Sequence, residues 1–187
     1  MTTYPKIFIH SILSSQMPLS IQYGLIQTEL GKVIMGISDH QVAHLSFIGE
    51  SVNEAICCLQ KEWPTASLAH SQEQIDEWVR RYQSVDSSIN QIELIRKGTP
   101  FQIDVWKELL TIPFGTTISY EALANQMGIP QSVRAVARGV ARNTMAFLIP
   151  CHRVILKSGA IHQYRWEKWR KKKLLELEKD NQSFFLY

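Results

Sequence analysis

The strongest constraint on the fold is a set of helix start and stop signals between residues 99 and 142. The run Thr99-Pro100-Phe101-Gln102 matches a capping box, in which the threonine and glutamine side chains bond to backbone N–H groups and proline occupies the first helical position. Apolar residues then recur at helical spacing: Phe101, Val105, Trp106, Leu109 and Leu110. This pattern predicts an amphipathic helix that ends before Pro113.

Two further helices are predicted after this one, joined by a short turn. Ser119 can cap a helix from Tyr120 to Met127, which Gly128 and Pro130 would end. A third helix is predicted from about Gln131 to Arg142. The pair is a helix-turn-helix candidate, but paired helices are common in helical proteins and do not by themselves indicate a function.

The composition of the third predicted helix favours contact with DNA. Arg134, Arg138 and Arg142 recur every four residues, so they share one side of the helix. Small residues lie between them: Ala135, Ala137, Gly139 and Ala141. A helix that enters a DNA groove needs little bulk and several guanidinium groups for phosphates. The alternative is a closely packed core helix whose arginines are solvated.

The segment LIPCHRVILKSG, residues 148–159, contains a cysteine between a proline and a histidine. Leu148-Ile149 and Val154-Ile155-Leu156 are predicted as short buried β segments. Pro150 lacks a backbone N–H, so the chain should turn there and leave Cys151 at an exposed, rigid point beside His152. Two readings stay open on these residues alone, a reactive thiol and a small buried hydrophobic side chain.

The first half of the chain has the pattern of a separate α+β domain over residues 1–95. Strands are predicted at Lys6–Leu13, Tyr23–Gln27, Lys32–Ser38 and Val42–Ile48. Amphipathic helices are predicted near Ser51–Trp63 and Ser71–Tyr82. Strands that precede helices are typical of α+β folds. The polar run Ser84–Asn90 is predicted as a linker or loop, and residues 96–187 as the second domain.

Cysteine usage and hydropathy bear on where the chain functions. Cys57, Cys58 and Cys151 make an odd count, and the adjacent pair is poorly placed to form a disulfide, which favours a reducing cytoplasm. No spacing of cysteine and histidine fits a zinc site, so we expect no metal. No apolar run approaches the roughly 20 residues of a membrane span, and we expect neither a secretion signal nor a membrane partner.

Charge is distributed unevenly along the chain. Residues 1–95 contain five Lys and Arg against ten Asp and Glu, a net charge of −5. Residues 96–187 contain fifteen against seven, a net charge of +8. This asymmetry indicates a polyanionic partner for the second half. The alternative is a basic, solvated face without a partner.

These residues together resemble a known family. The run from Thr99 to Asn143, followed by IPCHRV and then YRW, resembles the O6-alkylguanine-DNA alkyltransferases (methylated-DNA–protein-cysteine methyltransferases), and looks closest to the C-terminal domain of the bacterial adaptive-response members. The resemblance implies an N-terminal ribonuclease-H-like α/β domain and a C-terminal winged-helix-like domain with a helix-turn-helix. It also implies a monomer that acts without a cofactor on double-stranded DNA containing O6-alkylguanine, with O4-alkylthymine as a further candidate lesion.

The resemblance also implies a single-turnover transfer of the alkyl group to a thiolate, the strongest nucleophile a protein offers. Cys151 matches the acceptor. His152 matches the residue that takes the thiol proton through a water, and Glu178 the carboxylate that orients this histidine. Tyr120 matches the proton donor to the departing guanine, and Asn143 the hinge between recognition helix and cysteine. Taken singly, Tyr120, Asn143 and Glu178 also fit purely structural roles.

DNA contacts and a substrate pocket follow from the same resemblance. Arg134 matches the arginine that fills the space of a flipped base. The implied DNA-binding residues are Ser132, Arg134, Ala135 and Arg138, and the implied pocket residues are Tyr164, Arg165 and Trp166. An indole in the pocket wall would accept a methyl group and crowd a benzyl group. The alternative places Trp166 in the core.

The chain departs from the family pattern at three positions. Gln163 and Glu167 stand where relatives usually have glycine, which allows unusual backbone angles. Glu167 would place a carboxylate beside an anionic ligand, and nearby cations could offset it: Lys168, Arg170 and Lys171–Lys173. Arg138 stands where relatives carry a small residue, and could either contact phosphate or obstruct the groove.

Two other classes of function compete with repair. A non-catalytic, alkyltransferase-like lesion-binding protein would usually have tryptophan in place of the acceptor cysteine, so Cys151 argues against it. A Cys–His hydrolase fits poorly, because Cys151 and His152 are adjacent and the third helix is rich in arginine.

Overall fold

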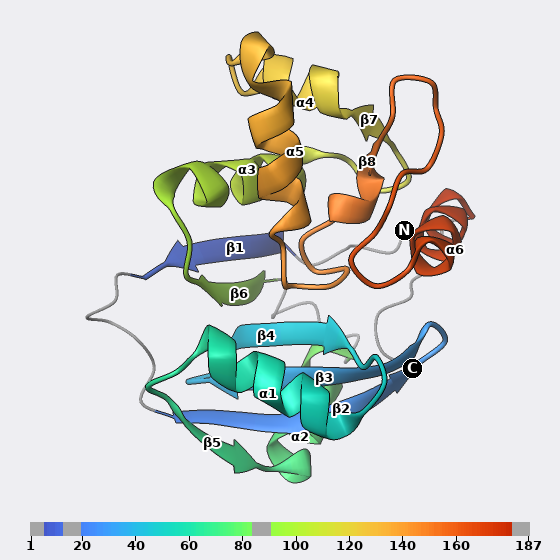
Figure 1. The fold of residues 1–187 in the computed structure, drawn as a ribbon. Coiled ribbons are helices and arrows are strands. Elements are labelled where there is room, and N and C mark those ends of the chain that lie inside the picture. Colours follow the sequence, from blue (N-terminus) through green and yellow to red (C-terminus); the bar gives the residue numbers. More distant parts are fainter. Residues whose placement is uncertain (1–5, 13–19, 84–90, 181–187) are drawn as a thin grey trace. The chain divides into compact units, whose positions relative to one another are not determined.

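The computed structural model describes residues 6–12, 20–83 and 91–180 (Figure 1). These residues fall into two compact units, the first ending at Lys97 and the second beginning at Gly98. The fold combines β-sheet and helices, which confirms the predicted mixed α and β class. Within the described ranges, no helix combines the length and apolar character of a membrane span. In the same ranges, no group of three or more His, Cys, Asp and Glu side chains could hold a metal ion.

The first unit is built on a six-stranded mixed sheet of order β1-β6-β4-β3-β2-β5. Its strands are β1 (Lys6–Ser11), β2 (Ser20–Thr28), β3 (Gly31–Ser38), β4 (Gln41–Phe47), β5 (Ser67–His70) and β6 (Gln91–Arg96). The meander β2-β3-β4 is antiparallel, whereas β5 and β6 pair in parallel with β2 and β4. The predicted order of strands before helices was therefore incomplete, since β5 and β6 follow helices. The predicted linker at 84–90 lies outside the described residues.

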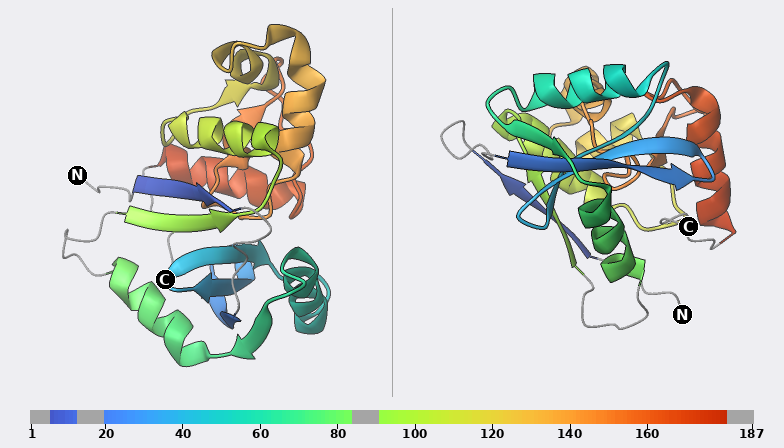
Figure 2. Two further views of the ribbon diagram at one scale, coloured as in Figure 1. Left: turned by 90° about the vertical axis from the view of Figure 1, so that its left-hand side faces the viewer. Right: turned by 90° about the horizontal axis from the view of Figure 1, so that it is seen from below.

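Two helices cover opposite faces of this sheet (Figure 2). Helix α1 (Val52–Glu62) begins at Ser51, whose side chain accepts a hydrogen bond from the N–H of Glu54, and helix α2 is Gln72–Gln83. A Cβ on Gly24 would lie 2.9 Å from Ile75 of α2. A Cβ on Gly36 would lie 3.4 Å from Leu59 of α1. Glycine in the strands thus lets both helices pack closely on the sheet.

The second unit is mainly helical. It contains α3 (Pro100–Thr111), β7 (Ile118–Ser119), α4 (Tyr120–Gln126), a 3₁₀ turn η2 (Pro130–Ser132), α5 (Val133–Ala141), a second 3₁₀ turn η3 (Cys151–Arg153), β8 (Val154–Ile155) and α6 (Lys168–Lys179). Strands β7 and β8 pair in parallel. Leu148-Ile149 was predicted as a β segment but lies in a buried turn, where the N–H of Ile149 bonds to the carbonyl of Ala146.

The predicted caps set the ends of these helices. Thr99 accepts from the N–H of Gln102 at 3.2 Å while the Gln102 side chain accepts from the N–H of Thr99 at 3.0 Å, which completes the capping box. Ser119 caps α4 by accepting from Ala122 at 3.0 Å. Gly128 follows α4 with φ of 72°, the left-handed conformation that suits glycine. Helices α4 and α5 therefore form the predicted helix pair.

Helix α5 packs on α3 through glycine. A Cβ on Gly139 would lie 3.0 Å from a methyl group of Val105, and the indole N–H of Trp106 donates to the Gly139 carbonyl at 3.1 Å. Gly139 is therefore small because of α3, and not because of a groove in DNA as the composition suggested. Arg134 and Arg138 of α5, and Arg142 at its C-cap, are exposed.

One backbone conformation in this unit is costly. Glu167, which precedes α6, has φ of 73° and ψ of 141°, a region that side chains with a Cβ rarely occupy. Its carboxylate accepts from the indole N–H of Trp169 and from Arg170, the latter at 3.0 Å. These contacts are exposed and compensate only weakly.

Replacing Glu167 with glycine should therefore stabilise the protein. We expect Glu167→Gly to unfold at higher denaturant concentration than Glu167→Ala, with a difference in unfolding free energy of about 1–2 kcal/mol. The alanine variant is the matched control, because it loses the same side-chain contacts and keeps the Cβ. Equal stability of the two variants, measured by urea unfolding, would show that the conformation carries no strain.

Candidate active site

Cys151 is buried, contrary to the exposed position predicted from Pro150. Only 6% of the residue is accessible, and the chain is continuously buried from Met145 to His152. The proline does turn the chain, but the turn lies under the surface of the second unit, so that the thiol is reached through a pocket. Burial raises the pKa of Cys151, although a hydrogen bond from Asn143 and the positive charge of Lys171 oppose this shift.

Asn143 joins the end of α5 to the cysteine. Its side-chain amide donates to the carbonyl oxygens of Met145 at 2.8 Å and Ile149 at 3.1 Å, and to Sγ of Cys151 at 3.1 Å. Its oxygen accepts from the N–H of Met145 at 2.9 Å. The residue is 1% exposed, so these bonds are shielded from water. The asparagine predicted as a hinge residue thus holds the thiol in a fixed position.

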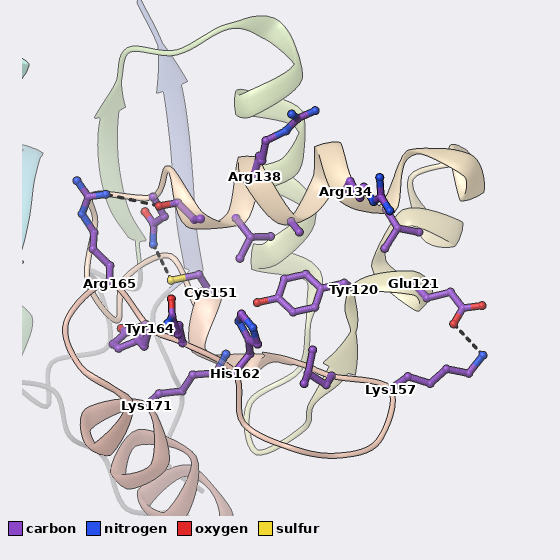
Figure 3. Close-up of a pocket in the computed structure, with 17 residues that line it drawn as sticks. Tyr120, Glu121, Arg134, Arg138, Cys151, Lys157, His162, Tyr164, Arg165 and Lys171 are labelled. Carbon is purple, nitrogen blue, oxygen red and sulfur yellow. Dashed lines mark hydrogen bonds and ion pairs between the residues drawn. The ribbon is translucent and has the colours of Figure 1, made fainter.

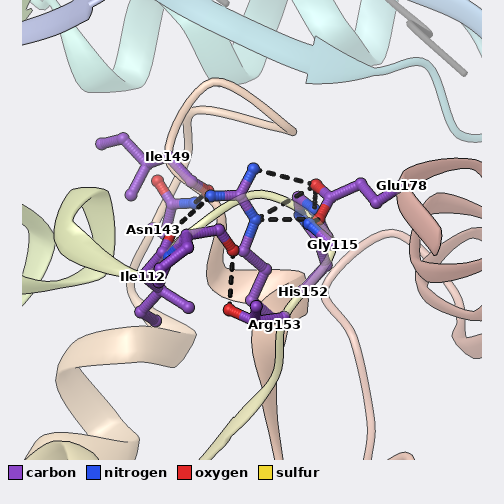
Figure 4. Close-up of polar contacts among 9 residues, drawn as sticks. Ile112, Gly115, Asn143, Ile149, His152, Arg153 and Glu178 are labelled. Carbon is purple, nitrogen blue, oxygen red and sulfur yellow. Dashed lines mark hydrogen bonds and ion pairs between the residues drawn. The ribbon is translucent and has the colours of Figure 1, made fainter. Parts of the chain in front are cut away.

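His152 and Glu178 form a buried pair (Figure 4). The Nε2–H of His152 donates to Oε1 of Glu178 at 2.7 Å, and both side chains are 0% exposed. The backbone N–H of Gly115 donates to Oε2 at 3.0 Å. The guanidinium of Arg153 donates to both oxygens at 3.0–3.1 Å and to the carbonyl of Ile112 at 2.6 Å. The carboxylate therefore accepts hydrogen bonds from a loop, the η3 turn and the histidine ring together.

The environment sets the protonation state of this pair. Burial lowers the pKa of His152, and the hydrogen bond to Glu178 opposes this shift without reversing it. Burial would raise the pKa of Glu178, but hydrogen bonds from His152 and Arg153 outweigh it and lower the pKa. At neutral pH the histidine is consequently neutral and the carboxylate is ionised.

A pocket of about 720 Å³ opens onto the cysteine (Figure 3). It is lined by Tyr120, Glu121, Val133, Arg134, Ala137, Arg138, Val140, Ala141, Asn143, Cys151, Leu156, Lys157, His162, Gln163, Tyr164, Arg165 and Lys171. Segments from α4, α5, η3, the loop before α6 and α6 itself thus meet around one thiol. Burial raises the pKa of Tyr120, and a Cys151 thiolate would raise it further, so the phenol keeps its proton and can donate it.

The structure separates the predicted DNA and pocket residues into two groups. Arg134, Arg138, Tyr164 and Arg165 line the pocket, but Ser132 and Ala135 do not. Trp166 does not line it either: the residue is 8% exposed and packs edge-to-face on Tyr164, with ring centroids 5.2 Å apart. The indole of Trp166 is therefore buried, as the alternative reading expected, and the wall of this pocket is formed by Tyr164 instead.

Three residues with contacts at the site were missed or misplaced by sequence reasoning. Lys171 was named only among the cations that could offset Glu167, but it is 1% exposed and donates to the carbonyl of Val154 at 2.6 Å. Its spacing from the buried Leu174 and Leu177 is that of a helix face and could have revealed this. No sequence pattern indicated a role at the site for Arg153 or His162.

Comparison with known proteins identifies the family of this chain. Residues 100–180 match the family model described as 6-O-methylguanine DNA methyltransferase, DNA binding domain. The Ada protein of Escherichia coli, described as a bifunctional transcriptional activator and DNA repair enzyme, is 38% identical over 171 residues, which cover 88% of this chain and 47% of Ada. The chain spans about half the length of the first curated relatives that it matches.

Other relatives are covered almost completely. The constitutive methylated-DNA–protein-cysteine methyltransferase of Bacillus subtilis is 32% identical over 148 residues, which cover 78% of this chain and 87% of that protein. The crystal structure of Mycobacterium tuberculosis OGT in complex with DNA superposes with a TM-score of 0.64 at 31% identity, over 86% of this chain and 94% of that one. The chain belongs to the methylated-DNA–protein-cysteine methyltransferase family.

Proposed function

We propose that this protein repairs DNA by transferring the alkyl group of O6-alkylguanine to Cys151, once per molecule. The observation that carries the proposal is the position of the thiol, held by Asn143 at a pocket and next to a buried His152–Glu178 pair. A deprotonated thiol in such a place is a strong nucleophile, and the neutral histidine is a base able to produce it. Membership of the family supports the same reaction.

The proposed reaction balances as a nucleophilic displacement at carbon. Because Nε2 of His152 is bound to Glu178, the thiol proton would be accepted at Nδ1, which is also buried, through a water. The Cys151 thiolate then attacks the alkyl carbon, the bond from that carbon to O6 breaks, and its electrons remain on guanine. The phenol of Tyr120 lines the same pocket and is the proposed proton donor to the leaving base.

Glu178 is a positioning residue in this scheme, because it touches the histidine and not the substrate. Its negative charge stabilises the imidazolium that forms when His152 accepts a proton. Arg153 binds the same carboxylate and holds it toward the histidine.

Duplex DNA is the proposed partner, bound through α5. Arg134, Arg138 and Arg142 are exposed on this helix, and Arg134 and Arg138 also border the pocket, where a flipped base would enter. Ser132 and Ala135 lie at the start of the same helical segment, half-buried, and are proposed to contact the backbone.

The remaining expectations complete the proposal. The units would correspond to a ribonuclease-H-like domain over residues 1–95 and a winged-helix-like domain over residues 96–187. We further propose a monomer that works in a reducing cytoplasm and needs no cofactor; the three free cysteines support the reducing compartment. The alternative, a non-catalytic lesion-binding protein, is less well supported, because a thiol with an adjacent base has no purpose in binding alone.

Mass spectrometry of the protein after incubation with duplex DNA containing O6-methylguanine tests the proposed reaction. We expect one added CH₂ on Cys151 and no further turnover, because the thioether has no route back to a thiol. Cys151→Ser should transfer nothing while still binding DNA. The matched controls are Cys57→Ser and Cys58→Ser, which change exposed thiols of α1. Repeated turnover, or tight binding without transfer by the unaltered protein, would contradict the proposal.

Arg134→Ala should slow transfer from duplex DNA by about tenfold or more, because the proposed role of the arginine is to stabilise the extruded base. Transfer from free O6-benzylguanine should change much less. Arg142→Ala is the control, since it removes a charge of the same helix from a residue outside the pocket lining. Single-turnover rates at saturating DNA compare them, and an equal loss on both substrates would assign Arg134 a structural role.

The acid limb of the pH profile should lie below the usual histidine range. His152 has a lowered pKa, so it stays neutral, and able to accept the thiol proton, at pH values where an ordinary histidine is protonated. The single-turnover rate should therefore hold as pH falls through about 6.5 and decline only below it. A decline centred on the ordinary histidine value would show that the histidine is solvated during the reaction.

A further inference from the structure

His162 lies in the pocket and takes no part in the proposed reaction. It belongs to the loop between β8 and α6, and its imidazole points into the cavity toward Tyr120 and Lys171 (Figure 3). The residue itself is exposed, so its position is not explained by core packing. A histidine that lines the cavity around a nucleophile can act on the substrate.

Two further hydrogen-bond donors line the same cavity. Lys171 is 1% exposed, yet it lines the pocket, and one of the three N–H groups of its ammonium donates to Val154. The hydroxyl of Tyr164 is buried beside Cys151 and has no other hydrogen-bond partner among the described residues. A methyl group on O6 offers nothing to such donors, because it has no acceptor atom.

The side chains that line the pocket carry a net positive charge. Lys171 and Arg165 line it as cations. The acidic side chain at its edge, Glu121, forms an ion pair with Lys157 at 2.8 Å. The field in the cavity is therefore positive, which favours a negatively charged group beside the thiol.

We propose that His162 is a specificity-determining residue, and that with Lys171 it selects O6-alkyl groups that end in a carboxylate, such as carboxymethyl. The inference rests on the proposed alkyl transfer and names its preferred substrate class. The chemistry is unchanged: Sγ bonds to the methylene carbon, that carbon leaves O6, and the carboxylate passes intact to the protein. Charge-assisted bonds to the carboxylate hold the methylene carbon in front of the sulfur.

The competing role for these donors is recognition of the guanine ring. In that case they would contribute equally to every O6-alkylguanine, whatever the alkyl group. The two roles are separated by the ratio of rates on two substrates, and not by either rate alone.

The experiment compares single-turnover transfer from duplexes that contain O6-carboxymethyl-, O6-isobutyl- or O6-methylguanine. The isobutyl group has nearly the shape of carboxymethyl without its charge. In His162→Leu we expect the carboxymethyl-to-isobutyl rate ratio to fall about tenfold or more, the effect of losing a hydrogen bond to a charged group. In His162→Arg, which keeps an N–H donor at this position, the ratio should be largely retained. Because the residue is exposed in a loop, both variants should fold, which circular dichroism checks.

Each outcome separates the two hypotheses. An unchanged ratio in His162→Leu, or a parallel fall on all three duplexes, overturns the specificity role while leaving alkyl transfer intact. Absence of transfer from all three duplexes by the unaltered protein overturns the proposed function itself.

Discussion

The candidate active site depends on the hydrogen bonds that the buried carboxylate of Glu178 accepts. Glu178 is 1% exposed and accepts hydrogen bonds from His152, Arg153 and Gly115, which come from different parts of the second unit. A buried charge is tolerated only when its partners satisfy it, and removing it would leave the partly buried guanidinium of Arg153 without its carboxylate. The same group therefore stabilises the unit and, in the proposed reaction, orients the base, so that a substitution at this position would change stability and chemistry together.

At Cys151, unlike at Glu178, burial outweighs the interactions that favour the ionised form. Burial opposes ionisation of the thiol, while Asn143 and Lys171 favour the thiolate. The resting protein consequently keeps a protonated, shielded sulfur, and in the proposed reaction the neighbouring histidine ionises it when substrate fills the pocket. A nucleophile controlled in this way is protected from the oxidation that low-pKa, accessible thiols undergo.

Local sequence patterns predicted much of the second unit, whereas contacts between residues far apart in the sequence could not be predicted from such patterns. The caps at Thr99 and Ser119 depend on residues three positions away, so the sequence alone located those helix starts. The burial of Cys151 depends on Asn143, eight residues away, and on packing that no local pattern records. The two-residue strands β7 and β8 pair across more than thirty residues and leave little periodicity to detect. The His152–Glu178 pair was expected only through resemblance to a family.

The contact between Gly139 and Val105 also limits how this protein can evolve. A methyl group at position 139 would lie 3.0–3.3 Å from the side-chain carbons of Val105, closer than packed atoms normally approach. Alanine at 139 therefore requires Val105 or α5 to move by a few tenths of an ångström, unless position 105 has first become smaller. The order in which mutations arise thus matters: a reduction at 105 opens a path to alanine at 139, and the reverse order passes through an intermediate in which Val105 or the arginine-bearing helix is shifted.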